Sequence, residues 1–212
     1  MMLKNLFSQY KFFLSKGYTR KELFIKFFVY KILSSIRRVL FLDFNTFGDR
    51  SIVDFRAQVD GSSKINIGCD VFVQKNAWLV VPLFEIKNLK DDPYIVIGDG
   101  VRIGANCTIS SAYSIVIEDD VLLGPNVMIL DHIHEYANDK TKPISKQGIR
   151  VKGSITIKKG AWIGTNVVIV PKNSNLIIGE NSIIGANSFV NFSVPNNCIV
   201  AGNPATVIDS LY

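Results

Sequence analysis

Histidine is scarce in this 212-residue chain, which contains only His132 and His134. The three cysteines lie far apart without the spacing of metal ligands, and Cys69 and Cys107 are expected to be small buried hydrophobic residues. No uninterrupted apolar run approaches the roughly 20 residues that a membrane-spanning helix needs. With 48% hydrophobic and 20% charged residues, the chain is expected to be a folded cytoplasmic protein without a cleaved signal.

Acidic residues are almost absent from residues 1–40. This segment has nine Lys or Arg residues and one acid, Glu22, which gives a net charge of +8, whereas the rest of the chain carries −2. Apolar residues recur along it at helical spacings, and Thr19 with Glu22 resembles a capping box that opens a second helix, from Arg20 to about Arg37. We therefore interpret residues 1–50 as a basic amphipathic helical segment.

Three interpretations of this basic segment compete. It can cap the open end of a repeat fold, which needs a cover. Alternatively, its interleaved Lys and Phe residues can bind an anionic membrane leaflet through residues 1–40, which would place the protein at the inner membrane face. Nucleic acid is not expected as a partner, because no known nucleic-acid-binding motif accompanies the charge.

A six-residue repeat begins at about Ile52. In the consecutive hexads IEDDVL, LGPNVM and ILDHIH, the first position is a large aliphatic residue and the fifth is again apolar. This period is neither helical nor that of a simple strand, and it is the signature of a parallel β-helix built from hexapeptides. The first position of a hexad can be placed at Val53, Val59, Ile67, Val73, Leu79, Ile97, Ile103, Ile109, Ile117, Leu123, Ile129, Ile157, Ile163, Ile169, Ile178 and Ile184.

Two polar stretches do not fit this register. They are residues 84–94 and residues 135–154, and the second begins directly after His134. Loops of such length without evident structure are usually functional or disordered. The prediction is therefore a β-helix domain over residues 51–212 with two insertions, and substrate specificity is expected to reside in the insertions.

The hexad pattern also predicts which side chains face outward. The first and fifth positions point into the prism and the sixth points out, which places Ile129 and Ile133 in the core, His132 at a corner and His134 outside. Other sixth positions are apolar, namely Leu122, Met128, Trp162, Val168, Ile183 and Phe189. An outward column this apolar predicts that another subunit covers it.

A subunit interface would partly desolvate His134. Desolvation favours the neutral imidazole, which is the form that a general base needs. Asp131 and His132 are close enough in sequence to orient it, although Asp131 can instead cap the turn. Trp162 is expected either to pack in the interface or to form the wall of a ligand cleft.

The stretch from about Ile97 to Ile208 resembles the left-handed β-helix O-acetyltransferases of the hexapeptide-repeat superfamily, in the group of maltose, galactoside and surface-polysaccharide acetyltransferases. The segment DHIHEY (131–136) resembles the one that holds their catalytic histidine, with His134 in its place. AWIGTNVVIVP (161–171) is similar to their coenzyme A segment. IIGANSFV (183–190) and VPNNCIVAGNPATVI (194–208) are similar to their closing coils.

This resemblance implies transfer of an acetyl group from acetyl-CoA to a sugar hydroxyl, in a surface polysaccharide or its lipid-linked precursor, by a homotrimer with active sites between subunits. It implies His134 as the general base, assisted by Asp131 and His132. The residues that it assigns to the donor channel are Trp162, Gly164, Thr165, Gly185, Ala186, Gly202, Asn203 and Pro204, with Lys172 as a substitute phosphate contact.

Two alternatives stay open from the sequence. One is an N-acetyltransferase acting on a nucleotide amino sugar, because its base and donor site would look alike. The other is a non-catalytic β-helix scaffold that binds partners through its insertions. A zinc-dependent hydratase of the same fold needs three histidine ligands, and the chain has two, so no metal is expected.

Overall fold

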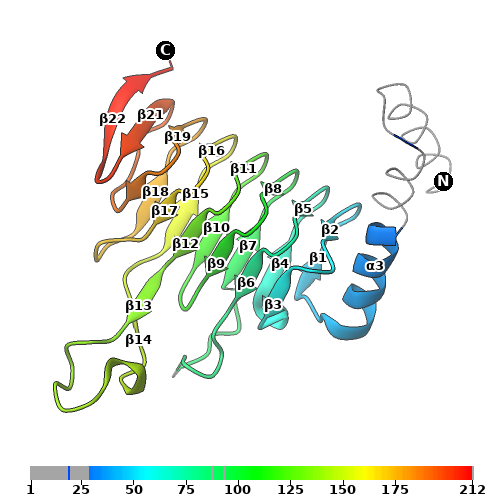
Figure 1. Cartoon of the computed structure of the whole chain (residues 1–212), viewed down its shortest axis with the longest axis horizontal. Coiled ribbons are helices and arrows are strands. Elements are labelled where there is room, and N and C mark those ends of the chain that lie inside the picture. Colours follow the sequence, from blue (N-terminus) through cyan, green and yellow to red (C-terminus); the bar gives the residue numbers. More distant parts are fainter. Residues whose placement is uncertain (1–18, 20–28, 87, 93, 212) are drawn as a thin grey trace.

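The computed structural model describes residues 19, 29–86, 88–92 and 94–211 (Figure 1). The pairing of Thr19 with Glu22 and most of the helix predicted from Arg20 lie outside the described residues. Within them, helix α3 spans Tyr30–Phe41, so it continues beyond the predicted end at Arg37. The chain then enters a β-helix whose coils follow one another along the length of the molecule.

The β-helix has three parallel faces. The first face contains β1 (Thr46–Phe47), β4 (Ile65–Ile67), β7 (Ile95–Ile97), β10 (Ile115–Ile117), β15 (Ile155–Ile157) and β18 (Leu176–Ile178). The second contains β2 (Ile52–Val53), β5 (Phe72–Val73), β8 (Arg102–Ile103), β11 (Leu122–Leu123), β16 (Trp162–Ile163), β19 (Ile183–Ile184), β21 (Cys198–Gly202) and β22 (Ala205–Ser210), the last antiparallel to β21. The third contains β3 (Gln58–Asp60), β6 (Trp78–Val80), β9 (Thr108–Ser110), β12 (Met128–Leu130), β17 (Val168–Ile169) and β20 (Phe189–Val190).

The prediction of inward-facing first positions is confirmed. Fifteen of the sixteen predicted first positions are buried, and the other, Val59, is half-buried against the core. The aliphatic side chains stack in register from coil to coil, as Ile95, Ile115 and Ile155 do on the first face. Stacking like residues inside the prism buries a continuous core that no single coil could bury alone.

One corner of the prism, between the second and third faces, carries a ladder of asparagines. Asn76, Asn106, Asn126, Asn166 and Asn187 all have φ between 58° and 60°, in the left-handed region that asparagine tolerates better than most residues. The first four side-chain amides each donate to the amide oxygen of the asparagine on the next coil, at 2.9 to 3.2 Å. The repeat therefore places asparagine where the chain must turn sharply and where neighbouring coils need a polar contact.

The hexad starting at Ile129 is an exception, and two expectations drawn from it are wrong. The chain leaves the prism after Leu130 and forms β13 (His132–His134), which pairs antiparallel with β14 (Ile149–Val151). Ile133 therefore lies half-exposed on this hairpin instead of in the core. His134 does not belong to the outward column either, because it stands on the same hairpin.

The remaining members of that column are divided between two faces. Leu122, Trp162 and Ile183 are register neighbours on the second face. A separate row on the third face consists of Met128, Val168 and Phe189. All six are exposed or half-buried, so the outward orientation is correct, although a single column is not.

Both predicted insertions project from the same side of the prism, at the corner where the third face leads into the first (Figure 1). The first connects β6 to β7. The second connects β12 to β15 and is more ordered than expected, because it contains a 3-10 turn, Ile144–Lys146, as well as β14. Between them, at the corner that joins β9 to β10, lie residues 111–114. This corner therefore gathers three successive connections, and it is called the insertion corner below.

Candidate active site

The carboxylate of Asp131 lies at the centre of the insertion corner and is completely buried. Its Oδ2 accepts hydrogen bonds from the hydroxyl of Ser111 at 2.6 Å and from the backbone N–H groups of Tyr113 and Ser114, both at 2.9 Å. Its Oδ1 accepts from the backbone N–H of Ala112 at 2.8 Å. This many donors hold the carboxylate in a single orientation.

The ring of His132 forms a further hydrogen bond with this carboxylate. Its Nδ1 lies 2.8 Å from Oδ1 of Asp131, and its side chain is only 12% exposed. Because a charged carboxylate can only accept, Nδ1 must carry the proton in this contact. The neutral ring then has its lone pair on Nε2, which makes Nε2 the atom that can take a proton from a substrate.

His134 has a different environment. It is exposed at the end of β13, where its backbone pairs with Ile149. Its ring has no polar partner within the part of the chain that the structure describes. Asp131 thus both caps the turn at 111–114 and orients a histidine, and the histidine that it orients is His132.

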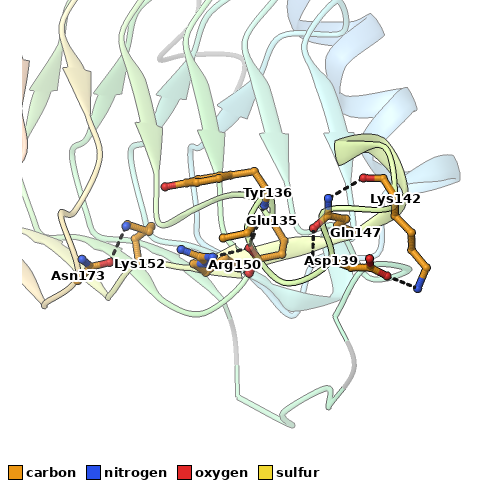
Figure 2. A network of polar contacts seen from close by, with 9 residues as sticks. Glu135, Tyr136, Asp139, Lys142, Gln147, Arg150, Lys152 and Asn173 are labelled. Carbon is orange, nitrogen blue, oxygen red and sulfur yellow. Dashed lines mark hydrogen bonds and ion pairs between the residues drawn. The ribbon is translucent and has the colours of Figure 1, made fainter.

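A polar network links the two sides of the hairpin that β13 and β14 form (Figure 2). The guanidinium of Arg150 on β14 donates to both carboxylate oxygens of the buried Glu135, which also accepts from the backbone N–H groups of Tyr136 and Ala137. These hydrogen bonds, that of Arg150 first, lower the pKa of Glu135 to about 2. The same guanidinium lies 5.1 Å from the centre of the Tyr136 ring, which is 55% exposed.

The residues assigned to the donor lie along another edge of the prism, the corner that also carries the asparagine ladder. Trp162 is 49% exposed on β16, Thr165 and Ala186 occupy the corner on successive coils, and Gly202 to Pro204 form the exposed turn between β21 and β22. We call these residues the donor stripe. The structure thus brings this predicted group together, apart from Lys172.

Two positions of the donor stripe are occupied by glycine because neighbouring coils pack closely there. A Cβ at Gly164 would lie 2.7 Å from the carbonyl oxygen of Ile184, and one at Gly185 would lie 2.9 Å from the Cβ of Ala201. Both spaces are filled by the next coil. The surface open to a ligand is therefore made by Trp162 and the exposed turn that begins at Gly202.

Lys172 lies elsewhere. It follows β17 at the insertion corner, where Lys152 donates to Asn173 at 2.5 Å (Figure 2). The donor stripe and the pair Asp131–His132 are thus separated by the width of the third face, roughly 17 Å for five residues of extended chain. A ligand that spans this face, or a second subunit, is needed to join the two parts into one site.

Sequence reasoning missed Lys90, Tyr113 and the ion pair of Glu135 with Arg150. The sequence did carry one signal, since residues 111–114 lengthen the corner between two hexads and so expose Tyr113. Within the described residues, no group of three His, Cys, Asp or Glu side chains is placed to hold a metal ion.

Comparison with known proteins agrees with the repeat and the fold. Residues 94–130 and 175–205 match the hexapeptide repeat of succinyl-transferase. Galactoside O-acetyltransferase of Escherichia coli is 34% identical over 64% of this chain and 62% of its own length. The putative lipopolysaccharide biosynthesis O-acetyl transferase WbbJ of the same organism is 32% identical over 54% of this chain and 59% of its own. The chain thus spans less than two thirds of each relative.

A solved structure of a related protein has a similar fold. Galactoside acetyltransferase in complex with coenzyme A superposes with a TM-score of 0.53 at 28% identity, over 84% of this chain and 69% of that chain. The fold, the repeat and the corner site define a hexapeptide-repeat β-helix protein. Within that class, the chain is similar to galactoside O-acetyltransferase and to WbbJ of Escherichia coli.

Proposed function

We propose that this protein transfers an acetyl group from acetyl-CoA to a hydroxyl group of a sugar, in a surface polysaccharide or its lipid-linked precursor. The observation that supports this most directly is the imidazole of His132, held by a buried carboxylate with Nε2 as its basic atom. The two relatives, whose names are those of O-acetyltransferases, support the reaction class. The geometry favours His132 over His134 as the general base.

In the proposed reaction, Nε2 of His132 takes the proton of the acceptor hydroxyl while the oxygen attacks the thioester carbonyl. Asp131 stabilises the imidazolium that forms. When the tetrahedral intermediate collapses, the C–S bond breaks, and the imidazolium returns its proton to the sulfur of coenzyme A. Base catalysis of this kind typically contributes about 10²–10⁴-fold, and holding both substrates in place contributes much of the rest.

Acetyl-CoA suits the donor stripe in shape and chemistry. The exposed ring of Trp162 offers a flat apolar surface, and the exposed turn that begins at Gly202 extends the surface open to a ligand. We propose that the protein is a homotrimer, in which the stripe of one subunit faces the insertion corner of the next. The apolar outward residues of the second and third faces, such as Leu122 and Met128, support covering by a neighbour.

A thiol-release assay tests the function. Purified protein is mixed with acetyl-CoA and with sugars, nucleotide amino sugars or polysaccharide fragments. We expect release that depends on a hydroxyl acceptor, a loss of about 10²-fold or more in His132→Ala, and near-normal turnover in the matched variant His134→Ala. Thiol release that occurs only with amino-sugar acceptors would favour transfer of the acetyl group to nitrogen. No release, together with no acetyl-CoA binding by calorimetry, would instead favour a scaffold.

We further propose that residues 1–40 contact an anionic membrane surface. Helix α3 rests on the first coil through its polar side, where Ser34 accepts from the backbone N–H of Phe55 and Arg37 donates to the carbonyl of Ala57. Its apolar side chains are between 39% and 76% exposed: Ile32, Leu33, Ile36, Val39, Leu40 and Phe41. A helix that served only as a cap would bury this face against the prism.

The charge of the same segment indicates an anionic partner. A net charge of +8 over residues 1–40 complements anionic lipid, and an apolar helix face beside it can enter the headgroup region. None of the described helices has the length and hydropathy to cross a bilayer. The expected contact is therefore peripheral.

Co-sedimentation with vesicles tests this contact. The protein should pellet with vesicles that contain phosphatidylglycerol, more weakly at high salt, and scarcely with phosphatidylcholine alone. Ile36→Glu with Val39→Glu should abolish pelleting, whereas Ile208→Glu, at an exposed position of β22, should not. Equal pelleting of all variants would contradict the proposal, as would self-association of the protein through α3 without vesicle binding.

A further inference from the structure

Lys90 in the first insertion is held in place at three points. Its backbone N–H donates to the hydroxyl of Tyr94 at 2.9 Å, and its carbonyl accepts from Nζ of Lys64 at 2.6 Å. Its ammonium group lies 3.8 Å from the centre of the Tyr113 ring. An exposed lysine normally samples many rotamers. The two backbone hydrogen bonds fix where this side chain starts, and the contact with the Tyr113 ring places its charge.

These contacts connect Lys90 to the candidate base. The backbone N–H of Tyr113 donates to Oδ2 of Asp131. The hydroxyl of Ser111 lies 2.9 Å from the carbonyl oxygen of the buried Tyr94 and 2.6 Å from the same Oδ2. Tyr113 thus contacts both Lys90 and the carboxylate behind His132, and Tyr94 is linked to that carboxylate through Ser111. The position of this cation is therefore fixed relative to the base.

No carboxylate neutralises Lys90 within the described part of the chain. The same insertion contains Glu85, Asp91 and Asp92, yet none of them forms an ion pair with its ammonium group. A ring face attracts a cation without using up its N–H donors. Lys90 therefore keeps donors for a ligand at the insertion corner.

We propose that Lys90 binds an anionic group of the acceptor, so that the preferred substrate is a negatively charged sugar. The group is either the carboxylate of an acidic sugar or the phosphate of a phosphorylated or nucleotide-linked sugar. The ring of Tyr113, which is 40% exposed, provides an apolar face for the sugar beside the charge. This inference rests on the proposed function, because it assigns specificity to the same site.

Matched acceptors separate this role from a purely structural one. The substitution Lys90→Met keeps the apolar stem and removes the charge. We expect kcat/KM for galacturonate and for glucose 1-phosphate to fall roughly tenfold or more, mostly through KM, while values for galactose and glucose stay near wild type. Lys90→Arg should recover part of the loss. Lys159→Met, at an exposed lysine on the corner between the first and second faces, is the control and should change nothing.

The two sources of negative charge are distinguished by the two acceptor pairs. A loss confined to galacturonate identifies a carboxylate site, and a loss confined to glucose 1-phosphate identifies a phosphate site. Equal losses for neutral and anionic acceptors, with a lower unfolding temperature, would show that Lys90 only anchors the loop and would overturn the proposal.

Binding measured by calorimetry keeps this test separate from the test of the reaction. Galacturonate should bind wild type more tightly than galactose, and Lys90→Met should remove the difference, whether or not transfer is observed. If transfer to neutral acceptors proceeds and Lys90→Met changes binding and transfer equally for neutral and anionic acceptors, then the inference fails while the proposed function stands.

Discussion

The Nδ1 atom of His132 lies 2.8 Å from Oδ1 of Asp131, the residue that directly precedes it. Consecutive residues of a strand normally point to opposite faces. Asp131 stands just before β13 begins, with its carboxylate buried in the insertion corner, and the ring of His132 reaches the same carboxylate. Two adjacent positions of the chain therefore supply both the candidate base and the group that orients it.

Substitution of this carboxylate by an amide should remove activity. In Asp131→Asn, the amide oxygen can satisfy the three donors at Oδ2, and its NH₂ group would then face Nδ1 of His132. The ring would have to accept at Nδ1 and carry its proton on Nε2, which cannot act as a base. Turnover should fall about 10²–10⁴-fold, and stability should fall by about 1–3 kcal/mol because a buried N–H donor is left unpaired.

Turnover and urea unfolding measure these two effects separately. Ser111→Ala is the control, because it removes one of several donors to Asp131 and leaves the contact with His132. It should reduce turnover far less. Wild-type turnover in Asp131→Asn would show that the carboxylate does not set the tautomer of His132.

The ion pair of Glu135 with Arg150 should make stability depend on pH in acid. The folded pKa of Glu135, about 2, lies below its ordinary value of 4.5, so the unfolded chain binds this proton more readily. The stabilisation is complete above about pH 4.5 and is lost as the pH falls towards 2. Arg150→Met removes the first cause of this shift, and the free energy of unfolding should then vary less over the same interval.

Limited proteolysis provides a second measurement of the same ion pair. Residues 135–148 should be cleaved faster in Arg150→Met than in wild type, because the hairpin loses its main side-chain contact (Figure 2). Lys142→Met is the control, since its exposed ion pair with Asp139 lies farther out on the loop. An unchanged pH profile and unchanged cleavage would show that the pair does not stabilise the hairpin.

The three cysteines should differ in reactivity. Burial raises the pKa of the Cys107 thiol to about 11, and its Sγ lies 3.1 Å from the carbonyl oxygen of Gly124. Cys69 and Cys198 are half-buried, so the expectation of a buried residue is confirmed for Cys107 and is wrong for Cys69. With an aromatic disulfide reagent at pH 8, two thiols should react in the folded protein and the third only after unfolding. Cys107→Ala should leave the folded count at two, and a count of three in folded wild type would contradict this.

The asparagine ladder should tolerate glycine better than alanine. Asn126 has φ of 60°, accepts from Asn106 and donates to Asn166. Both substitutions remove these hydrogen bonds, but only alanine adds the cost of a left-handed backbone, about 1–2 kcal/mol. Urea unfolding should therefore find Asn126→Ala less stable than Asn126→Gly by about 1 kcal/mol. Equal stabilities would show that the corner relaxes out of this conformation.

Much of the fold could be predicted because one face of every strand is buried, which fixes the register of each hexad. Ile115 and Ile155, placed two residues before a hexad start, turned out to begin three-residue strands of the first face. The same reasoning failed at Ile133, because HIH also alternates in an antiparallel hairpin. Sequence period alone cannot distinguish the two strand directions.

The candidate site could be predicted only in part. The hexad pattern placed residues 135–154 outside the repeat, but it kept Ile133 of the segment DHIHEY in the core, whereas the structure has it half-exposed on β13. The choice between two histidines was beyond the sequence, because the partners of Asp131 come from residues 111–114 on the preceding coil. Lys90 was missed for the same reason, since its contact with Tyr113 joins two different connections of the chain.

The pairing of Ile115 has a consequence for how such a protein can diverge. Its partner on one side, Ile95, is twenty residues away, and its partner on the other, Ile155, is forty residues away, yet both pair in register. A connection at the insertion corner can therefore grow, shrink or be exchanged without a change in the coils on either side. Descendants of one gene can in this way change the proposed acceptor site through mutations in a single surface connection, while the buried aliphatic core stays the same.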